Sequence, residues 1–218
     1  MSHEKKFIFM KTAKTAGTSV EIFFEPYCLP PSSGVRRERT EEVVSSAGIV
    51  GYRGPDPSKS AFYNHMSAND LRKKLGESCW NEYFKFSVIR NPFDKLVSAF
   101  YFFNRDNLTV SKNIQEDFLI NSFRHWVVSN KGPLDRHIYT IDGNVCLDYF
   151  IRYESLLDDI KYLCEVFEIK FDSAQFGEYK RGFRNELVAL ARYYDAATIR
   201  VVEQLYDLEL QHFGYALE

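Results

Sequence analysis

The stretch that decides the fold is residues 7–19, FIFMKTAKTAGTS, in which a short apolar segment runs into a turn of small and hydroxyl residues. Residues 7–10 predict a buried strand, and the apolar positions of residues 18–25 predict a helix. Backbone N–H groups at the start of a helix have no intrahelical partner and carry partial positive charge. With Lys14, Gly17 and three hydroxyl side chains nearby, the turn predicts an anion site. The alternative is an ordinary strand-to-helix connection with a surface lysine.

The turn differs from the standard triphosphate-binding loop. That loop has a glycine, four residues and then Gly-Lys-Ser/Thr, so its lysine follows the last glycine. Here Lys14 comes three positions before Gly17, and the turn contains no Gly-Lys pair. The sequence therefore indicates a phosphate-like group more clearly than it indicates ATP.

Composition limits the function classes. The chain has 218 residues, 45% of them hydrophobic, which predicts one domain over residues 1–218. A net charge of −2 provides no global basic field for nucleic acid or a membrane surface. No apolar run approaches the ~20 residues of a membrane span, and the N-terminus does not resemble a signal peptide. Four scattered cysteines fit a reducing, cytoplasmic compartment and argue against a zinc site or a disulfide scaffold.

Residues 26–60 are rich in Pro, Ser, Gly and Arg and predict a long irregular loop. Loops of this length are usually functional or mobile, so the segment is either a substrate-facing flap or a simple excursion. Regular structure resumes where Ser67 is placed to cap a helix that Gly76 ends.

A second candidate site follows residues 83–89, YFKFSVI, which predict a buried central strand. The strand ends at Arg90, and Asn91 and Pro92 are suited to begin a helix. Ligands of open parallel sheets bind beyond the carboxyl ends of strands, where both Lys14 and Arg90 fall. Arg90 and Ser98 can together bind a phosphate monoester, or Arg90 can simply pair with Asp94. The spacing alone does not choose between these two interpretations.

The rest of the chain completes an α/β pattern. Residues 114–128 predict one or two helices, and segments 137–141 and 145–152 predict a hairpin around Gly143. Ser155 is placed to cap a helix with an apolar stripe that runs from Leu156 through Leu157 to Phe167, and a last long helix begins near Asp195. Strands and helices alternate early, which favours a mainly parallel sheet with helices on both faces.

Two segments resemble one enzyme family. Residues 14–19, KTAGTS, resemble the 5′-phosphosulfate loop of sulfotransferases that use 3′-phosphoadenosine 5′-phosphosulfate (PAPS), and residues 90–100, RNPFDKLVSAF, resemble the 3′-phosphate segment of their carbohydrate branch. Residues 150–156 and 205–215 also resemble that branch, so the likeness covers nearly the whole chain in order. The resemblance implies a P-loop-NTPase-like three-layer sandwich. Without an anchor in the chain, a bacterial cytoplasmic member fits better than a resident Golgi enzyme.

The resemblance also implies roles for individual residues. A 5′-phosphosulfate would be held by Lys14, Thr15, Ala16, Gly17, Thr18 and Ser19. The 3′-phosphate would be held by Arg90 and Ser98. A third loop over the nucleotide falls on Lys180, Arg181 and Arg184, which otherwise form a solvated basic turn.

Transfer to a hydroxyl needs a base, and a histidine near its reference pKa suits that task. His65 lies between an apolar segment and a helix cap, and in this branch a histidine in a similar position serves as base. His65 is otherwise a structural cap or a hydrogen-bond donor to substrate. Glu21 is the next candidate for the base, although a surface position on its helix is the simpler interpretation. Lys14 would stabilise the leaving phosphate oxygen, and the chemistry requires no metal.

The sequence therefore predicts in-line sulfuryl transfer from PAPS to a hydroxyl of a saccharide or glycoconjugate, with no nucleic-acid or membrane partner. The alternatives are a P-loop-like small-molecule kinase and a non-catalytic nucleotide-binding relative. Basic residues of the long loop that can meet an acidic sugar are Arg36, Arg37, Arg39, Arg53 and Lys59.

Overall fold

The computed structural model describes residues 1–33, 39–106, 115–129, 132–173, 176 and 188–217. These residues form two compact units, each with its own hydrophobic core. The first unit comprises Met1–Ile89 and Asp135–Tyr179, and the second comprises Arg90–Leu134 and Lys180–Glu218.

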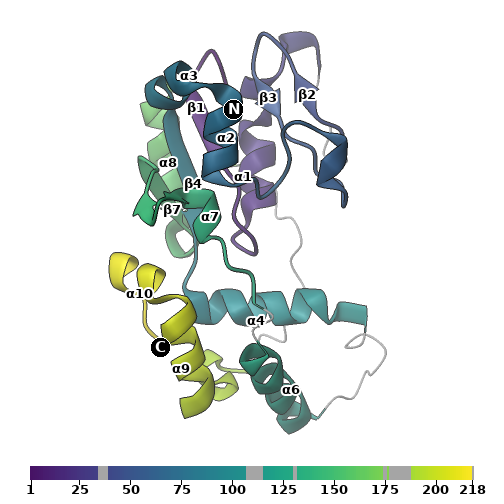
Figure 1. Cartoon of the computed structure of the whole chain (residues 1–218), viewed down its shortest axis with the longest axis vertical. Helices are drawn as coiled ribbons and strands as arrows, with labels where there is room; N and C mark the ends of the chain where they lie inside the picture. The colour runs from purple at the N-terminus through teal and green to yellow at the C-terminus, as the bar shows by residue number, and fades with distance from the viewer. Residues whose placement is uncertain (34–38, 107–114, 130–131, 174–175, 177–187, 218) are drawn as a thin grey trace. The chain divides into compact units, whose positions relative to one another are not determined.

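A three-stranded parallel sheet lies at the centre of the first unit (Figure 1). Its order is β1 (Phe7–Met10), β4 (Phe84–Ile89) and β7 (Tyr149–Arg152), with Phe7 opposite Phe84 and Phe86 opposite Tyr149. Five consecutive residues of β4 are buried, as expected for a central strand covered on both faces. The predicted parallel sheet is thereby confirmed.

Helices cover both faces of this sheet (Figure 1). On one face, side chains of all three strands share a core with α1 (Gly17–Phe24) and α8 (Leu156–Val166). On the other face lie α2 (Ala68–Leu75), α3 (Glu77–Glu82) and α7 (Arg136–Tyr139). This is the predicted three-layer α/β arrangement.

The core under β1 is aromatic. Phe7 contacts the rings of Phe24, Phe86 and Phe167, with ring centroids 5.4, 5.7 and 5.0 Å apart. Each fully buried phenylalanine contributes roughly 1.5–3 kcal/mol. This packing holds the start of β1 against α1, β4 and the residue that follows α8.

The described part of the predicted long loop contains several short elements. These are the 3₁₀ turns η1 (Glu25–Cys28), η2 (Pro31–Ser33) and η3 (Pro57–Lys59) and the antiparallel pair β2 (Val43–Val44) and β3 (Ile49–Val50). Two arginines of this segment are buried against α1 and η1: Arg39 pairs with Glu25, and Arg53 pairs with Glu25 and Glu21. These two arginines are therefore held inside the first unit and are not placed to meet an acidic sugar.

Three sequence predictions are wrong in detail. The hairpin is limited to β5 (Thr140–Ile141) and β6 (Asn144–Val145), whereas residues 137–139 belong to α7 and residues 149–152 join the central sheet as β7. Ser155 precedes α8, but its hydroxyl bonds to Asp159 and does not cap the helix. Leu157 is exposed and does not belong to the buried stripe of α8.

The second unit is helical. It contains α4 (Pro92–Phe103), α6 (Glu116–Val128), η6 (Leu190–Tyr193), α9 (Ala196–Leu205) and α10 (Asp207–Phe213). Asn91 caps α4 as predicted, and Asp195 and Thr198 form a capping box at α9. The expected single last helix is interrupted at the buried Tyr206, whose hydroxyl donates to the carbonyl of Pro133.

Among the described residues, no helix combines the length and apolar character that a bilayer span needs.

Candidate active site

The turn after β1 has a backbone suited to an anion. Lys14 and Ala16 adopt left-handed conformations, with φ of 60° and 62°, although neither is glycine. Such residues cost of order 1 kcal/mol each and persist where the surrounding structure enforces them. Ala16 is the N-cap of α1, and its methyl side chain cannot accept the first N–H groups of the helix. Left-handed residues at a helix start are typical of concave N–H arrays that bind anions.

Thr12 anchors this turn to the central strand. Its hydroxyl donates to the carbonyl of Val88 at 2.5 Å and lies 2.9 Å from the hydroxyl of Thr15. Because the Thr12 proton is used on Val88, Thr15 donates to Thr12. The hydroxyl of the fully buried Thr15 is therefore engaged inside the turn. Any contact of Thr15 with a bound anion would have to come from its backbone.

Gly17 is required by close packing. A Cβ atom at this position would lie 2.9 Å from Cγ of Lys11 and 3.2 Å from the carbonyl oxygen of Thr12. An added methyl group would therefore push against the turn's own backbone. Glycine at position 17 lets the start of α1 lie close to residues 11 and 12.

His65 lies next to the same turn. Its Nδ1 is 3.0 Å from the carbonyl oxygen of Lys11, and its backbone is also left-handed, with φ of 61°. A carbonyl only accepts, so in the neutral ring Nδ1 carries the proton and Nε2 carries the lone pair. This is the tautomer that a general base acting through Nε2 requires.

The surroundings of His65 keep it neutral. His65 is exposed to solvent, yet desolvation of its packed side is the main cause that lowers its pKa, and the Lys11 charge lowers it further. Asp135, the Lys11 carbonyl and Glu21 act in the opposite direction, and the net pKa lies below the ordinary value of 6.5. The lowered pKa favours the unprotonated ring, which is able to accept a proton.

Glu21 is a structural ion-pair partner and is poorly suited to be a base. Its carboxylate lies 2.6 Å from Lys11 Nζ and 3.1 Å from Arg53 Nε. Burial alone would raise the pKa of Glu21, but the charges and hydrogen bonds of Lys11 and Arg53 outweigh it and lower the pKa. The predicted surface position is also wrong, because the side chain is only 14% exposed.

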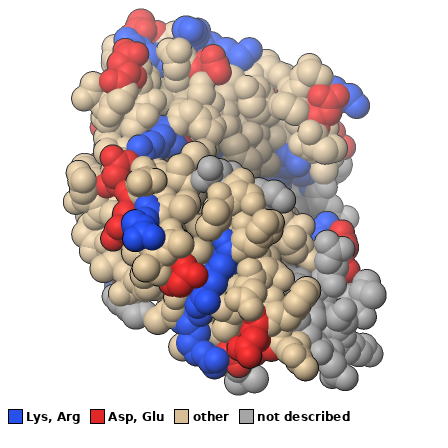
Figure 2. Space-filling model, turned by 60° about the horizontal axis from the view of Figure 1, so that its bottom comes forward, with Lys and Arg blue, Asp and Glu red and all other residues tan. Residues whose placement is uncertain are grey.

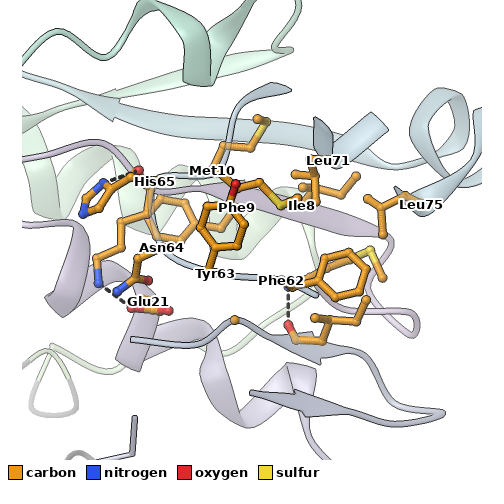
Figure 3. A pocket seen from close by; sticks show the side chains of 15 residues that line it. Ile8, Phe9, Met10, Glu21, Phe62, Tyr63, Asn64, His65, Leu71 and Leu75 are labelled. Atoms are coloured by element: carbon orange, nitrogen blue, oxygen red, sulfur yellow. Dashed lines mark hydrogen bonds and ion pairs between the residues drawn. The ribbon is translucent and has the colours of Figure 1, made fainter. Parts of the chain in front are cut away.

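A pocket of about 80 Å³ opens beside these residues (Figure 3). His65, Asn64 and Glu21 line one end, and Phe62, Leu71 and Leu75 line the other. Between them lie Ile8, Phe9 and Met10 of β1 and the ring of Tyr63. The first unit thus combines an anion-type turn, a neutral histidine and a partly apolar recess.

The second candidate site belongs to the second unit. Arg90, which directly follows β4, pairs with Asp94 through Nε at 2.7 Å and Nη2 at 2.6 Å. Ser98 lies one turn further along α4 on the same face as Asp94 and is half-buried. The predicted Arg90–Asp94 pair is therefore present, and it orients the guanidinium group at the start of α4.

The remaining predicted residues lie outside the described part of the chain or at its surface. Lys180, Arg181 and Arg184 lie outside the described residues, as do Arg36 and Arg37. Lys59 is exposed and lies 3.8 Å from Asp56. Within the described part of the chain, no group of three or more His, Cys, Asp or Glu residues is arranged to hold a metal ion.

Figure 2 shows one face of the molecule, where basic and acidic side chains lie interspersed among uncharged ones. This pattern agrees with the near-neutral net charge of −2.

Sequence reasoning missed three residues of the first site: Lys11, Thr12 and Asp135. Lys11 and Thr12 begin the turn, and a polar pair directly after an apolar strand is a usable signal. Asp135 accepts a hydrogen bond from the backbone N–H of Ala13 at 2.9 Å, across 122 positions of sequence. Nothing local in the sequence marks such a distant partner.

Comparison with known proteins identifies the family. A model of the sulfotransferase family matches residues 1–216, so the chain belongs to that family. Searches of curated proteins and of solved structures each found no match. Family membership supports transfer of a sulfuryl group and, in general, a hydroxyl-bearing acceptor.

Proposed function

We propose that this protein transfers a sulfuryl group from PAPS to a hydroxyl of a saccharide or glycoconjugate. The observation that carries the proposal is the hydrogen bond between His65 and the carbonyl of Lys11, which holds His65 as the Nδ1–H tautomer. Lys11 is also the residue that leads into the turn at Lys14. An anion-type turn and a neutral base that is hydrogen-bonded to the segment leading into the turn are the two elements that sulfuryl transfer to an alcohol requires. The resemblance to the carbohydrate branch supports a saccharide acceptor.

The turn fits the sulfated phosphate of the donor. Two left-handed residues, a helix start without a side-chain cap and Lys14 are suited to a compact anion. The position of the lysine before the glycine argues against a kinase-type triphosphate loop. We assign the 5′-phosphosulfate to residues 14–19.

In the proposed reaction His65 Nε2 accepts the proton of the acceptor hydroxyl as the oxygen attacks sulfur in line with the departing phosphate. The Lys11 carbonyl holds the ring through Nδ1, which also stabilises the imidazolium that forms. Lys14 offsets the charge that develops on the leaving phosphate oxygen. These are electrostatic and positioning roles, as in phosphoryl transfer.

The 3′-phosphate of the donor has its own candidate residues at the start of α4. We propose that Arg90, oriented by Asp94, binds the 3′-phosphate together with Ser98. The basic residues Lys180, Arg181 and Arg184 are proposed to contact the nucleotide as a third loop. The family resemblance is the support for both assignments.

Calorimetry with adenosine 3′,5′-bisphosphate, the desulfated donor, tests the proposal. We expect micromolar or tighter binding without Mg²⁺ and much weaker binding of ATP with Mg²⁺. Radiolabelled PAPS should then label hydroxyl-bearing saccharides. Tight ATP–Mg²⁺ binding with no affinity for the bisphosphate would favour a kinase, whereas bisphosphate binding without transfer to any acceptor would favour a non-catalytic relative.

Lys14→Ala is the matched test of the turn. Loss of one charge-stabilising group should lower kcat by roughly 10²- to 10³-fold and weaken donor binding. Lys73→Ala, which removes an exposed lysine of α2, is the control and should leave both unchanged.

A further inference from the structure

Asp135 is a buried carboxylate at the start of α7. It is 3% exposed, and its Oδ2 accepts the Ala13 backbone N–H at 2.9 Å. Ala13 is the residue directly before Lys14, in the turn assigned to the donor. A buried negative charge is costly unless it is paired or hydrogen-bonded, and the Ala13 N–H is one of the groups that Asp135 is bonded to.

Residues 11–13 make three hydrogen bonds to distant parts of the first unit. The Lys11 carbonyl accepts from His65, the Thr12 hydroxyl donates to Val88 of β4, and the Ala13 N–H donates to Asp135. Three consecutive residues thus connect the turn to the histidine, to the central strand and to α7. A shift of this segment would displace both the turn and His65.

Asp135 also acts on His65 through its charge. The charged groups that act on His65 are Lys11, which lowers its pKa, and Asp135 and Glu21, which raise it. Asp135 therefore preserves part of the basicity that burial and Lys11 remove. A carboxylate at position 135 can serve both the geometry of the turn and the proton affinity of the base.

We propose that Asp135 is a positioning residue of the active site. Through its bond to the Ala13 N–H it fixes the donor turn and keeps the turn and His65 at a constant position relative to each other. This inference rests on the proposed function. By engaging the Ala13 N–H, Asp135 leaves recognition of the anion to residues 14–19.

Two substitutions separate the two effects. Asp135→Asn keeps an oxygen acceptor for the Ala13 N–H and removes the charge. We expect its dissociation constant for adenosine 3′,5′-bisphosphate to stay within about 3-fold of the wild-type value, with the His65 titration midpoint moved to lower pH.

Asp135→Ala removes the acceptor as well, and we expect its dissociation constant to rise about 10-fold or more. Calorimetry measures the binding, and NMR titration of the histidine ring protons measures the midpoint, with His65→Gln to assign the signal.

Asp148→Ala is the matched control. Asp148 accepts the Lys85 backbone N–H at 2.7 Å near the start of β4, so it makes the same kind of bond away from the turn, although it is more exposed than Asp135 and also pairs with Lys85 Nζ at 3.0 Å. Its loss should leave bisphosphate affinity and the His65 midpoint unchanged. If Asp148→Ala weakens binding as much as Asp135→Ala, general loosening explains the result and the positioning role is refuted.

The outcomes also separate this inference from the proposed function. A wild-type protein that does not bind the bisphosphate contradicts the proposed function, and with it the donor part of the inference. A wild-type protein that binds, with Asp135→Ala and Asp135→Asn matching it in affinity and in His65 midpoint, overturns the inference alone. Should Asp135→Ala fail to fold, Asp135→Leu, which keeps most of the side-chain volume and has no acceptor, decides: weakened bisphosphate binding supports the role and wild-type affinity refutes it.

Discussion

The carbonyl oxygen of Lys11 lies 3.0 Å from Nδ1 of His65, so the first residue after β1 sets the tautomer of the candidate base. The pKa of His65 is below 6.5, because burial and the Lys11 charge outweigh the groups that raise it. The lowered pKa therefore favours the neutral ring around pH 7, and the neutral ring is lost as the pH falls through this lowered value.

We expect kcat to be constant around pH 7 and to fall on the acid side only below pH 6.5, with a slope of one proton. His65→Ala should reduce turnover by roughly 10²-fold or more and remove this acid limb. Affinity for adenosine 3′,5′-bisphosphate should stay near the wild-type value, because His65 is assigned to the acceptor side. Steady-state kinetics from pH 5 to 8 and calorimetry check both parts, and an unchanged acid limb in His65→Ala would place the base elsewhere.

The elements predicted correctly are those with local signals. The strand at Phe7–Met10, the Ser67 cap and the Asn91–Pro92 helix start each depend on residues within a few positions of one another. Apolar periodicity and capping chemistry are properties of short windows, so the sequence alone is sufficient for them. The three-layer fold follows from the order of these elements.

The elements predicted wrongly depend on distant partners. Residues 149–152 resemble half of a hairpin, yet they pair with β4, in which Phe86 lies opposite Tyr149. The two last helices separate at Tyr206, whose hydroxyl bonds to Pro133, 73 positions earlier. In the site, the turn could be predicted, but the Asp135 contact to Ala13 could not, because no short window contains both residues.

Glu21 should contribute to stability through its ion pairs. Its carboxylate lies against Lys11 and Arg53 with 14% of the side chain exposed, and breaking a buried pair typically costs about 3–5 kcal/mol. We expect Glu21→Gln to lower the free energy of unfolding at pH 7 by about 3 kcal/mol, as urea denaturation can measure. The lowered pKa of Glu21 means that its stabilisation is complete above the ordinary value of 4.5 and is lost as pH falls below it.

The difference in stability between wild type and Glu21→Gln should therefore shrink as the pH is lowered from 5 towards 3. Glu77→Gln is the control, because its partner Arg72 is paired with it at the surface, and it should cause no measurable change. A Glu21→Gln protein as stable as the wild type, but with the acid limb of kcat removed, would instead return Glu21 to the role of base.

Arg90 should distinguish nucleotides by their 3′-phosphate. Asp94 holds the guanidinium through Nε and Nη2, and a planar guanidinium binds a phosphate with a geometry that lysine cannot reproduce. We expect Arg90→Lys to weaken binding of adenosine 3′,5′-bisphosphate by about 10-fold, equivalent to the loss of one charge-assisted hydrogen bond. Binding of adenosine 5′-phosphate, which lacks the 3′ group, should not change.

Arg105→Lys, at an exposed arginine of the same unit, is the control, and calorimetry with both nucleotides gives the ratio of affinities. A ratio that stays at the wild-type value in Arg90→Lys would show that Arg90 serves only as the partner of Asp94.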